Sequence, residues 1–342
     1  MKSQTKQMNL KRKAATFAQA DTRAGLLQLC NTVLPLAFLW VAAYQSLSLS
    51  IWLSLLFSVI GGGFVVRLFI IFHDCTHGSF FKHAKANRVL GTFLGIITHF
   101  PFEKWKRSHA MHHATSGNLD KRGTGDIWLL TIEEYEQASI WKKAAYRLYR
   151  NPLIMFGLGP LYLFLIENRL NKRGAKRKER FNTHVTNVAI VALYAVGNWL
   201  LGWQAFLLVQ GPLMFIAGAA GIWLFYVQHQ FEDSYFENEA GWDFVKAAVE
   251  GSSYYKLPKP LQWITGNIGF HHVHHLSPKV PNYNLEKTHQ QVVPLQKATT
   301  ITLATSLASL KFRLFDEKNK TFVSFGDFKK MRKMKLAAHR SL

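Results

Sequence analysis

The sequence predicts an all-α integral membrane protein in which four transmembrane helices form two hairpins and a helical cap outside the membrane holds a histidine-rich site. First, residues 26–72 carry a single charged side chain, Arg67, and residues 183–230 carry none. Second, each stretch is long enough for two helices of the roughly 20 apolar residues that cross a hydrocarbon core. Third, most of the histidines lie in clusters outside these two stretches. Paired, uncharged stretches of this length are typical of membrane spans rather than of the core helices of a soluble protein.

The four spans follow one another along the chain, and a short turn separates the members of each pair. They are expected at Leu26–Ser46 and Ile51–Phe72, joined through "SLSLS", and at Thr183–Leu201 and Phe206–Val227, joined through "GWQAF". The first span is too long for the core of a signal peptide, and no small-residue cleavage pattern closes it. We therefore expect it to remain as a membrane anchor.

The chain is expected to form a single membrane domain over residues 1–342. Its parts are a cytosolic N-terminus at 1–25, a first hairpin at 26–72, a cytosolic region with two histidine clusters at 73–182, a second hairpin at 183–227, and a cytosolic region with the third cluster and a basic tail at 228–342. Six spans are the alternative, because Val89–Phe102 and Leu153–Ile166 are also apolar. At about 14 residues each, these stretches are short for a span.

The distribution of basic residues predicts the orientation of the chain. Its 42 Lys and Arg against 20 Asp and Glu give a net charge of +22, and all but one of the basic residues lie at 1–25, 82–180 or 246–340. Because cytoplasmic loops are enriched in Lys and Arg, all three regions and both termini are expected in the cytoplasm, with the protein in the cell membrane. Attraction to anionic lipids explains the excess charge, and no nucleic-acid partner is expected.

Most of the histidines fall into three clusters with helical spacing. The clusters are His73 and His77 in "HDCTH", then His109, His112 and His113 in "HAMHH", and His271, His274 and His275 in "HHVHH". Residues three and four apart share one face of a helix, so each cluster can converge on one point. His272 is rotated by about 100° from its neighbour and is not expected to be a ligand.

One further histidine, His229, directly follows the fourth span and brings the set to nine imidazoles. A mononuclear zinc site takes four ligands, so nine would suit two metal ions. An all-imidazole set fits Fe, Zn, Cu or Ni. A ligating imidazole usually gives its outer N–H to a carboxylate or carbonyl, and Asp74, Glu232 and Asp233 are expected in that role. The remaining histidines, His83, His99, His184, His289 and His339, are expected to be structural.

These motifs resemble the three histidine boxes of membrane fatty acid desaturases. The similarity extends to "FHDCTHGSFF", "HATSGNLDKRGTGDIW", "WLFYVQHQFEDSYF" and "TGNIGFHHVHHLSPKVPNYNL", and covers nearly the whole chain. Within the family, the sequence looks most like the acyl-lipid desaturases of Gram-positive bacteria that act at the Δ5 position of membrane phospholipids. No departure from the family's box pattern is seen.

The resemblance implies a non-haem di-iron centre that uses O₂ and two electrons to introduce a cis double bond, at Δ5, into the acyl chains of membrane phospholipids. The residues that match the family's ligands are His73, His77, His109, His112, His113, His271, His274 and His275, with His229 as the additional histidine after the last span. No catalytic side chain beyond the metal centre is implied. Metal–oxygen chemistry suits an unactivated methylene, which offers side chains no acidic proton.

The electrons must come from another protein. "GLGPLY" and "GTGDIW" lack the third glycine and the strand–helix setting of a dinucleotide fingerprint, so no bound nucleotide cofactor is expected. By analogy with the bacterial relatives, the donor is expected to be a ferredoxin or a flavodoxin. Such carriers are usually acidic, and the basic cytoplasmic face would steer them.

Two other functions fit part of the pattern. A related di-iron membrane hydroxylase or ketolase acting on lipids shares histidine boxes, which by themselves do not separate hydroxylation from desaturation. A histidine-rich metal transporter should carry ionisable residues deep inside its spans, whereas the nine histidines fall outside the predicted spans. Desaturation is therefore the expected reaction, with hydroxylation as the alternative.

Overall fold

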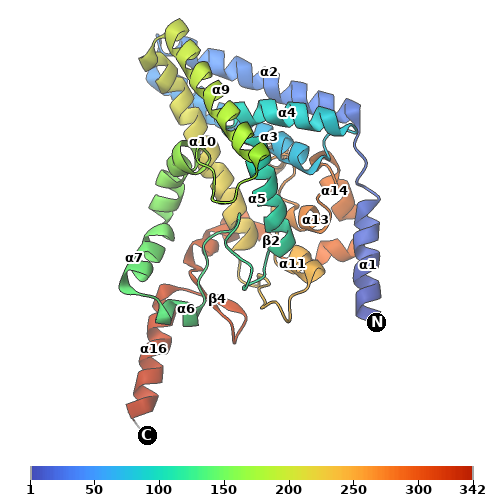
Figure 1. The fold of residues 1–342 in the computed structure, drawn as a ribbon, viewed down its shortest axis with the longest axis vertical. Coiled ribbons are helices and arrows are strands. Elements are labelled where there is room, and N and C mark those ends of the chain that lie inside the picture. The colour runs from blue at the N-terminus through green and yellow to red at the C-terminus, as the bar shows by residue number, and fades with distance from the viewer. Residues whose placement is uncertain (1, 341–342) are drawn as a thin grey trace.

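A bundle of long helices stands on a mixed helical cap in the computed structural model, which describes residues 2–340 (Figure 1). The turns of the two hairpins lie at the top of this view, and both ends of the chain lie at the bottom. The long helices are α2 (Thr22–Ser46), α3 (Ile51–His77), α9 (Arg177–Leu201) and α10 (Trp203–His229).

The remaining helices are shorter, and most of them lie around the lower ends of the long ones (Figure 1). They are α1 (Lys2–Ala15), α4 (Ala84–Ile97), α5 (Phe102–Thr115), α6 (Ile132–Gln137), α7 (Ile140–Tyr149), α8 (Gly159–Tyr162) between two π-helical turns at Ile154–Leu158 and Leu163–Glu167, α11 (Phe244–Glu250), α12 (Lys259–Ile264), α13 (His271–Leu276), α14 (Asn282–Gln291), α15 (Leu303–Ser306) and α16 (Phe325–Arg340). Two short 3₁₀ turns occupy Val293–Lys297 and Leu307–Lys311.

Two small sheets complete the cap. Strands β1 (Tyr254–Lys256) and β2 (Thr300–Thr302) pair in parallel, with Tyr255 opposite Ile301. Strands β3 (Leu314–Asp316) and β4 (Thr321–Val323) form an antiparallel pair. The cap is therefore mainly helical, as predicted, with the short strands joining its C-terminal segments.

The four-span prediction is confirmed among the described residues. Only the four long helices there are both long and apolar enough to cross a membrane, while Ile154–Glu167 is shorter, and α4 has 14 residues. The six-span alternative is therefore not supported. All four helices run further than the predicted spans. At their N-terminal ends α2 begins at Thr22, α9 at Arg177 and α10 at Trp203, and at their C-terminal ends α3 continues to His77 and α10 to His229.

Close packing of α3 against α10 forms the centre of the bundle. A side chain at Gly62 of α3 would lie 2.9 Å from Ile216 of α10 and 3.1 Å from the carbonyl of Leu213. Small residues let helices in a membrane approach closely, and the absence of a Cβ at Gly62 permits this contact. The lower ends of α3 and α10, which carry histidines, are thereby held side by side.

The lone charge within the spans, Arg67, is buried between helices. Its Nε donates to the Thr32 hydroxyl of α2 at 3.1 Å, a guanidinium N–H donates to the carbonyl of Trp263, and the guanidinium lies 3.9 Å from the centre of the Trp263 ring. Buried charges in membranes are usually paired with polar groups in this way. Arg67 therefore ties the first hairpin to α12.

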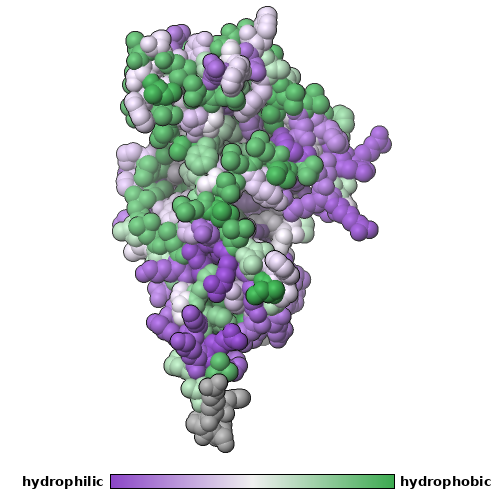
Figure 2. Space-filling model, turned by 90° about the vertical axis from the view of Figure 1, so that its left-hand side faces the viewer, coloured by the Kyte–Doolittle hydropathy of each residue, from purple (hydrophilic) through white to green (hydrophobic). Residues whose placement is uncertain are grey.

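Apolar side chains gather on the outside of the helical bundle, whereas most of the hydrophilic surface lies lower down (Figure 2). Large exposed side chains on the bundle include Phe38, Trp52, Val188 and Trp199. In water such a surface would be costly, since apolar area is unfavourably hydrated, but it suits contact with lipid tails. The surface thus agrees with a bundle that crosses a bilayer and a cap that stands outside it.

Candidate metal centre

The first histidine cluster lies where α3 ends. Gly78 closes the helix directly after His77 with φ +63° and ψ +37°, and its N–H donates to the carbonyls of Asp74 and Cys75. A left-handed residue at this position is the usual glycine role at a helix C-terminus. The last helical turn therefore presents His73 and His77 just below the apolar part of the span.

The other histidines reach the same place from three further helices. His109, His112 and His113 lie in the last two turns of α5, and His229 is the last residue of α10. The third cluster forms the short helix α13. A side chain at Gly269, just before α13, would lie 2.4 Å from the carbonyl of Tyr255, so the close approach of this loop to β1 needs glycine.

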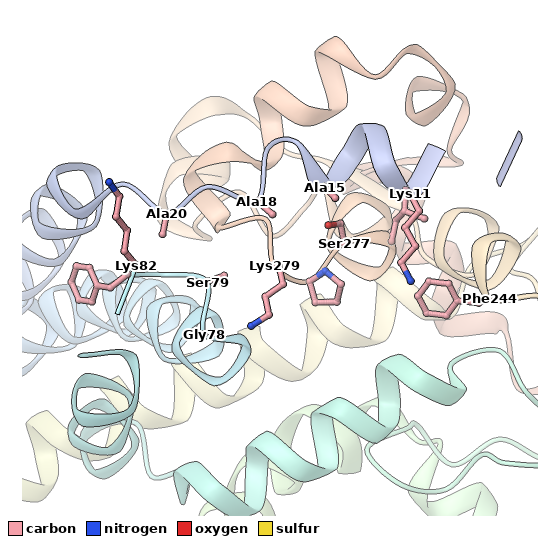
Figure 3. Close-up of a pocket in the computed structure, with 13 residues that line it drawn as sticks. Lys11, Ala15, Ala18, Ala20, Gly78, Ser79, Lys82, Phe244, Ser277 and Lys279 are labelled. Atoms are coloured by element: carbon pink, nitrogen blue, oxygen red, sulfur yellow. The ribbon is translucent and has the colours of Figure 1, made fainter. Parts of the chain in front are cut away.

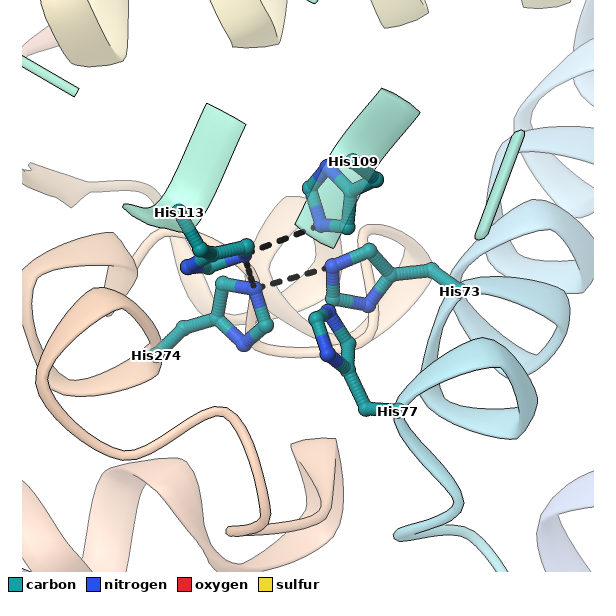
Figure 4. Close-up of side chains that lie close together, drawn as sticks. All are labelled: His73, His77, His109, His113 and His274. Atoms are coloured by element: carbon teal, nitrogen blue, oxygen red, sulfur yellow. Dashed lines mark hydrogen bonds between the residues drawn. The ribbon is translucent and has the colours of Figure 1, made fainter. Parts of the chain in front are cut away.

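Five of the nine predicted ligands form one group (Figure 4). Its members are His73, His77, His109, His113 and His274. The Nε2 atom of His274 lies 2.9 Å from Nε2 of His73 and 2.9 Å from Nε2 of His113, which in turn lies 3.0 Å from Nε2 of His109. The His77 ring lies against the other four.

The other four predicted ligands form a second, adjacent group. Nε2 of His229 lies 3.2 Å from Nε2 of His112 and 3.0 Å from Nε2 of His271, which lies 3.1 Å from Nε2 of His275. The His113 and His275 rings, one from each group, have centroids 4.3 Å apart. All nine residues singled out in the sequence therefore converge, and they divide into five and four.

Hydrogen bonds alone do not satisfy this arrangement. A neutral imidazole nitrogen either donates one N–H or offers one lone pair, yet Nε2 of His274 faces two other Nε2 atoms, as does Nε2 of His229. The buried Nε2 of His77 has no hydrogen-bond partner among the described residues. A cation that accepts a lone pair from every nitrogen of a group would resolve these contacts.

The distances between the nitrogens fit shared metal ions. With metal–nitrogen bonds of about 2.0–2.1 Å, neighbouring ligands of one ion are separated by about 2.9–3.4 Å, depending on the angle at the metal. The Nε2 separations within the two groups, 2.9–3.2 Å, fall in this range. The nine residues could therefore hold two ions, one in each group.

The protonation state of the cluster also suits metal binding. Burial, together with neighbouring imidazoles, lowers the pKa of the cap histidines well below the usual value; these are His109, His113, His271, His274 and His275. Desolvation disfavours the charged imidazolium form. At neutral pH these side chains are neutral, and each keeps a lone pair available to a metal.

In each group, one carboxylate contacts the outer ring nitrogen, Nδ1, of one histidine. Asp74 lies 3.1 Å from Nδ1 of His73 in the five-histidine group, and Asp126 lies 2.6 Å from Nδ1 of His112 in the four-histidine group. Such contacts set which ring nitrogen keeps its lone pair for the metal. Asp74 had been expected in this role.

The prediction that Glu232 and Asp233 accept the outer N–H groups of ligating imidazoles is wrong. Both side chains are exposed, because α10 ends at His229 and Gln230 leaves the helix with φ −117° and ψ 72°. The role of Asp126 was not predicted from the sequence. The feature that could have indicated it is a carboxylate in the glycine-rich loop "GTGD" that follows the second cluster. His229 instead has its Nδ1 3.2 Å from the carbonyl of Gly251.

His272 points away from both groups, as its position in the helix predicted. Its Nε2 lies 3.0 Å from Nδ1 of His289, and burial lowers its pKa to about 3. His83, His99, His184 and His289 also lie outside the two groups, and the side chain of His339 lies outside the described residues.

We expect His272→Ala to retain most of the activity of the folded protein. The loss of its partner leaves His289 unsatisfied and costs about 1–3 kcal/mol of stability, but no nitrogen of either group is removed. Activity should be measured per mole of folded protein, with helical content as the check on folding. Complete loss of activity in a folded variant would contradict the exclusion of His272 from the site.

Aromatic side chains border both groups. The Trp105 ring stacks on His109 with centroids 4.2 Å apart, and Phe225 lies 5.1 Å from the rings of both His112 and His229. Trp105 also contacts His73 edge-on at 5.6 Å. These apolar contacts hold the imidazoles in place and help to keep water from the cluster.

Four membrane-length helices with nine convergent histidines at their lower ends define a helical membrane protein with a histidine cluster suited to metal binding. A comparison with family models adds the specific family, since residues 50–304 match the model of the fatty acid desaturase domain. The chain belongs to the fatty acid desaturase family. It is therefore an oxidoreductase that desaturates fatty acyl chains.

Similar proteins come from bacteria and plants. The chain is 62% identical over 320 residues to a fatty acid desaturase of Bacillus subtilis, covering 94% of this chain and 91% of that protein. It is 29% identical to a Synechocystis sn-1 acyl-lipid omega-3 desaturase (ferredoxin), covering 70% of this chain and 67% of the relative. For a chloroplastic omega-6 fatty acid desaturase of Brassica napus the identity is 28%, over 68% of this chain and 52% of that protein.

Proposed function

We propose that the protein is an acyl-lipid desaturase that introduces a cis double bond, at the Δ5 position, into acyl chains of membrane phospholipids. The observation that carries the proposal is the convergence of nine imidazole nitrogens in two adjacent groups below the membrane helices. In the overall reaction two adjacent methylenes lose two hydrogens, and O₂ with two electrons and two protons becomes two water molecules.

The metal ions in this proposal are two iron ions. One would be held by His73, His77, His109, His113 and His274, and the other by His112, His229, His271 and His275. Bound iron supplies the activation of O₂ that the removal of hydrogen from a methylene requires. The ligand set supports iron because imidazole suits it, although imidazole also suits zinc and copper.

The residues of the chain itself shield and orient this site. Seven of the nine histidines are buried, and His77 and His109 are half-buried. Trp105 and Phe225 add apolar surface beside the two groups. A protected apolar environment allows an acyl chain to lie near the site and keeps reactive oxygen chemistry away from water.

The orientation and the electron donor are part of the same proposal. The lower ends of all four long helices carry the basic segments that the positive-inside rule assigns to the cytoplasm. We therefore propose that the helices cross the plasma membrane and that the cap and both termini lie in the cytoplasm. A soluble ferredoxin or flavodoxin would then supply the two electrons. The name of the Synechocystis relative mentions ferredoxin, and the net charge of +22 favours an acidic partner.

The test is the analysis of fatty acids from cells that express the chain and otherwise lack desaturases. We expect acyl chains lighter by two hydrogens, with the double bond placed at Δ5 by fragmentation in a mass spectrometer. Chains that instead gain an oxygen atom would identify the hydroxylase or ketolase alternative. A double bond at another position would reject the Δ5 assignment and leave the desaturase assignment standing.

A further inference from the structure

A pocket of about 630 Å³ lies outside the histidine cluster, where the first hairpin meets the cap (Figure 3). Its walls come from the C-terminal part of α1 and the linker to α2, from the loop after α3, and from the loop after α13, together with Phe244 of α11. Segments far apart in the sequence thus build one concavity. It is separate from the site described above, because none of the nine histidines lines it.

The polar character of this pocket is cationic. Lys11, Lys82 and Lys279 line it, and no carboxylate does. None of the three lysines forms a salt bridge with an Asp or Glu among the residues that the structure describes. The ammonium groups are spread along the pocket, with Lys82 and Lys11 at opposite ends and Lys279 between them (Figure 3). Three ammonium groups without a carboxylate partner make the concavity attractive to an anionic group such as a phosphate.

The rest of the lining is apolar. Ala15, Ala18, Phe81, Phe244 and Leu276 contribute hydrocarbon surface, and Lys11 lies 4.7 Å from the centre of the Phe244 ring. A free inorganic anion would leave this apolar surface exposed to water. A ligand with an anionic head and a hydrocarbon body would cover both kinds of surface.

The depth of the pocket agrees with such a ligand. Ala18 and Ala20 lie just before α2 enters its apolar stretch, and Gly78 and Ser79 lie just after α3 leaves its own. The pocket therefore lies at the level where the membrane helices meet the cap, which is the level of the lipid head groups. Basic pockets at this depth in membrane proteins are suited to lipid phosphates.

We propose that this pocket binds the phosphate-bearing head group of an anionic membrane phospholipid. Lys279, which lies between the other two lysines, contacts the head group, while Lys11 and Lys82 add positive charge at the two ends of the pocket (Figure 3). The apolar walls cover the adjoining glycerol and the first methylenes. Because the Lys279 ammonium also donates to the His77 carbonyl at 2.6 Å, the bound lipid lies against the backbone that ends α3. The lipid would hold the linker between α1 and α2 against the cap.

The test measures lipid binding and does not depend on desaturation. The full chain is purified in a detergent with an uncharged sugar head group, and binding of dioctanoyl phosphatidylglycerol is titrated. We expect the double variant Lys11→Gln and Lys82→Gln to weaken this binding about 10-fold or more, since it removes two of the three positive charges that line the pocket. Both lysines are exposed, so folding should be retained, and helical content verifies it.

The matched control is Lys13→Gln with Lys85→Gln, which removes the same charge from neighbouring exposed positions outside the pocket. It should change binding by less than about 2-fold, because screening weakens distant surface charges. An equal loss in the control would show a diffuse charge effect and overturn the proposal. Glycerol phosphate binding as tightly as the lipid would overturn the lipid assignment, and so would equal binding of dioctanoyl phosphatidylcholine.

Discussion

His274→Ala should abolish double-bond formation, with a loss of more than about 100-fold in activity. The Nε2 of His274 faces two others of the five-histidine group, those of His73 and His113, at 2.9 Å each. Its removal deletes the nitrogen that joins the end of α3 to the end of α5. Changes to residues that merely support metal ligands already cost 10–100-fold, so the loss of a ligand should cost more.

The measurements are product formation and iron content. The unchanged protein should contain two iron ions per chain, and His274→Ala should contain fewer. The matched control is His272→Ala, which removes a buried imidazole from the same short helix but leaves both groups intact. A folded His274→Ala protein that keeps two iron ions and full activity would remove His274 from the site.

Asp74→Asn should lower activity by about 10–100-fold, although the side chain has almost the same volume. The two carboxylate oxygens of Asp74 have different partners. Oδ1 faces Nδ1 of His73, while Oδ2 accepts from the backbone N–H of Asn282 at 2.6 Å and from its side-chain amide at 2.8 Å. An amide satisfies the two donors of Asn282 only by turning its oxygen toward them.

The substitution changes which ring nitrogen of His73 carries the proton. In that orientation the new NH₂ group faces Nδ1, which must then act as an acceptor, so the ring proton moves to Nε2. A protonated Nε2 has no lone pair for a metal. Iron binding by the five-histidine group should weaken, and excess iron should partly restore activity if the effect acts through the metal.

Two further variants serve as comparisons for Asp74→Asn. Asp126→Asn makes the corresponding change behind His112, where the carboxylate is only half-buried, and should cost less than Asp74→Asn. Glu232→Gln changes an exposed carboxylate close to His229 in the sequence and should leave activity unchanged. Equal losses in all three variants would indicate a general charge effect rather than control of the histidine tautomers.

The sequence alone determined the span pattern and picked out the nine histidines that converge at the ends of the spans. Both depend on local regularities, because a membrane helix must be apolar over its own length and histidines three and four apart share a helix face whatever surrounds them. The same reasoning excluded His272. The same reasoning placed His229 with the clusters, because a residue at the end of a span lies at the same depth in the membrane as the ends of the other spans.

Tertiary structure decided how these residues are combined. The division into groups of five and four, in which His271 joins the second group through His229 and His275, depends on how the ends of α3, α5 and α10 meet α13. That meeting follows from contacts such as that of Gly62 with Ile216. Asp126 contacts His112 because the loop that carries it returns to the end of α5. Glu232 does not contact a ligating histidine, because the chain leaves the helix at Gln230. Likewise, three lysines from separate segments share one pocket. Such placements depend on packing between distant segments, and local spacing in a sequence does not encode that packing directly.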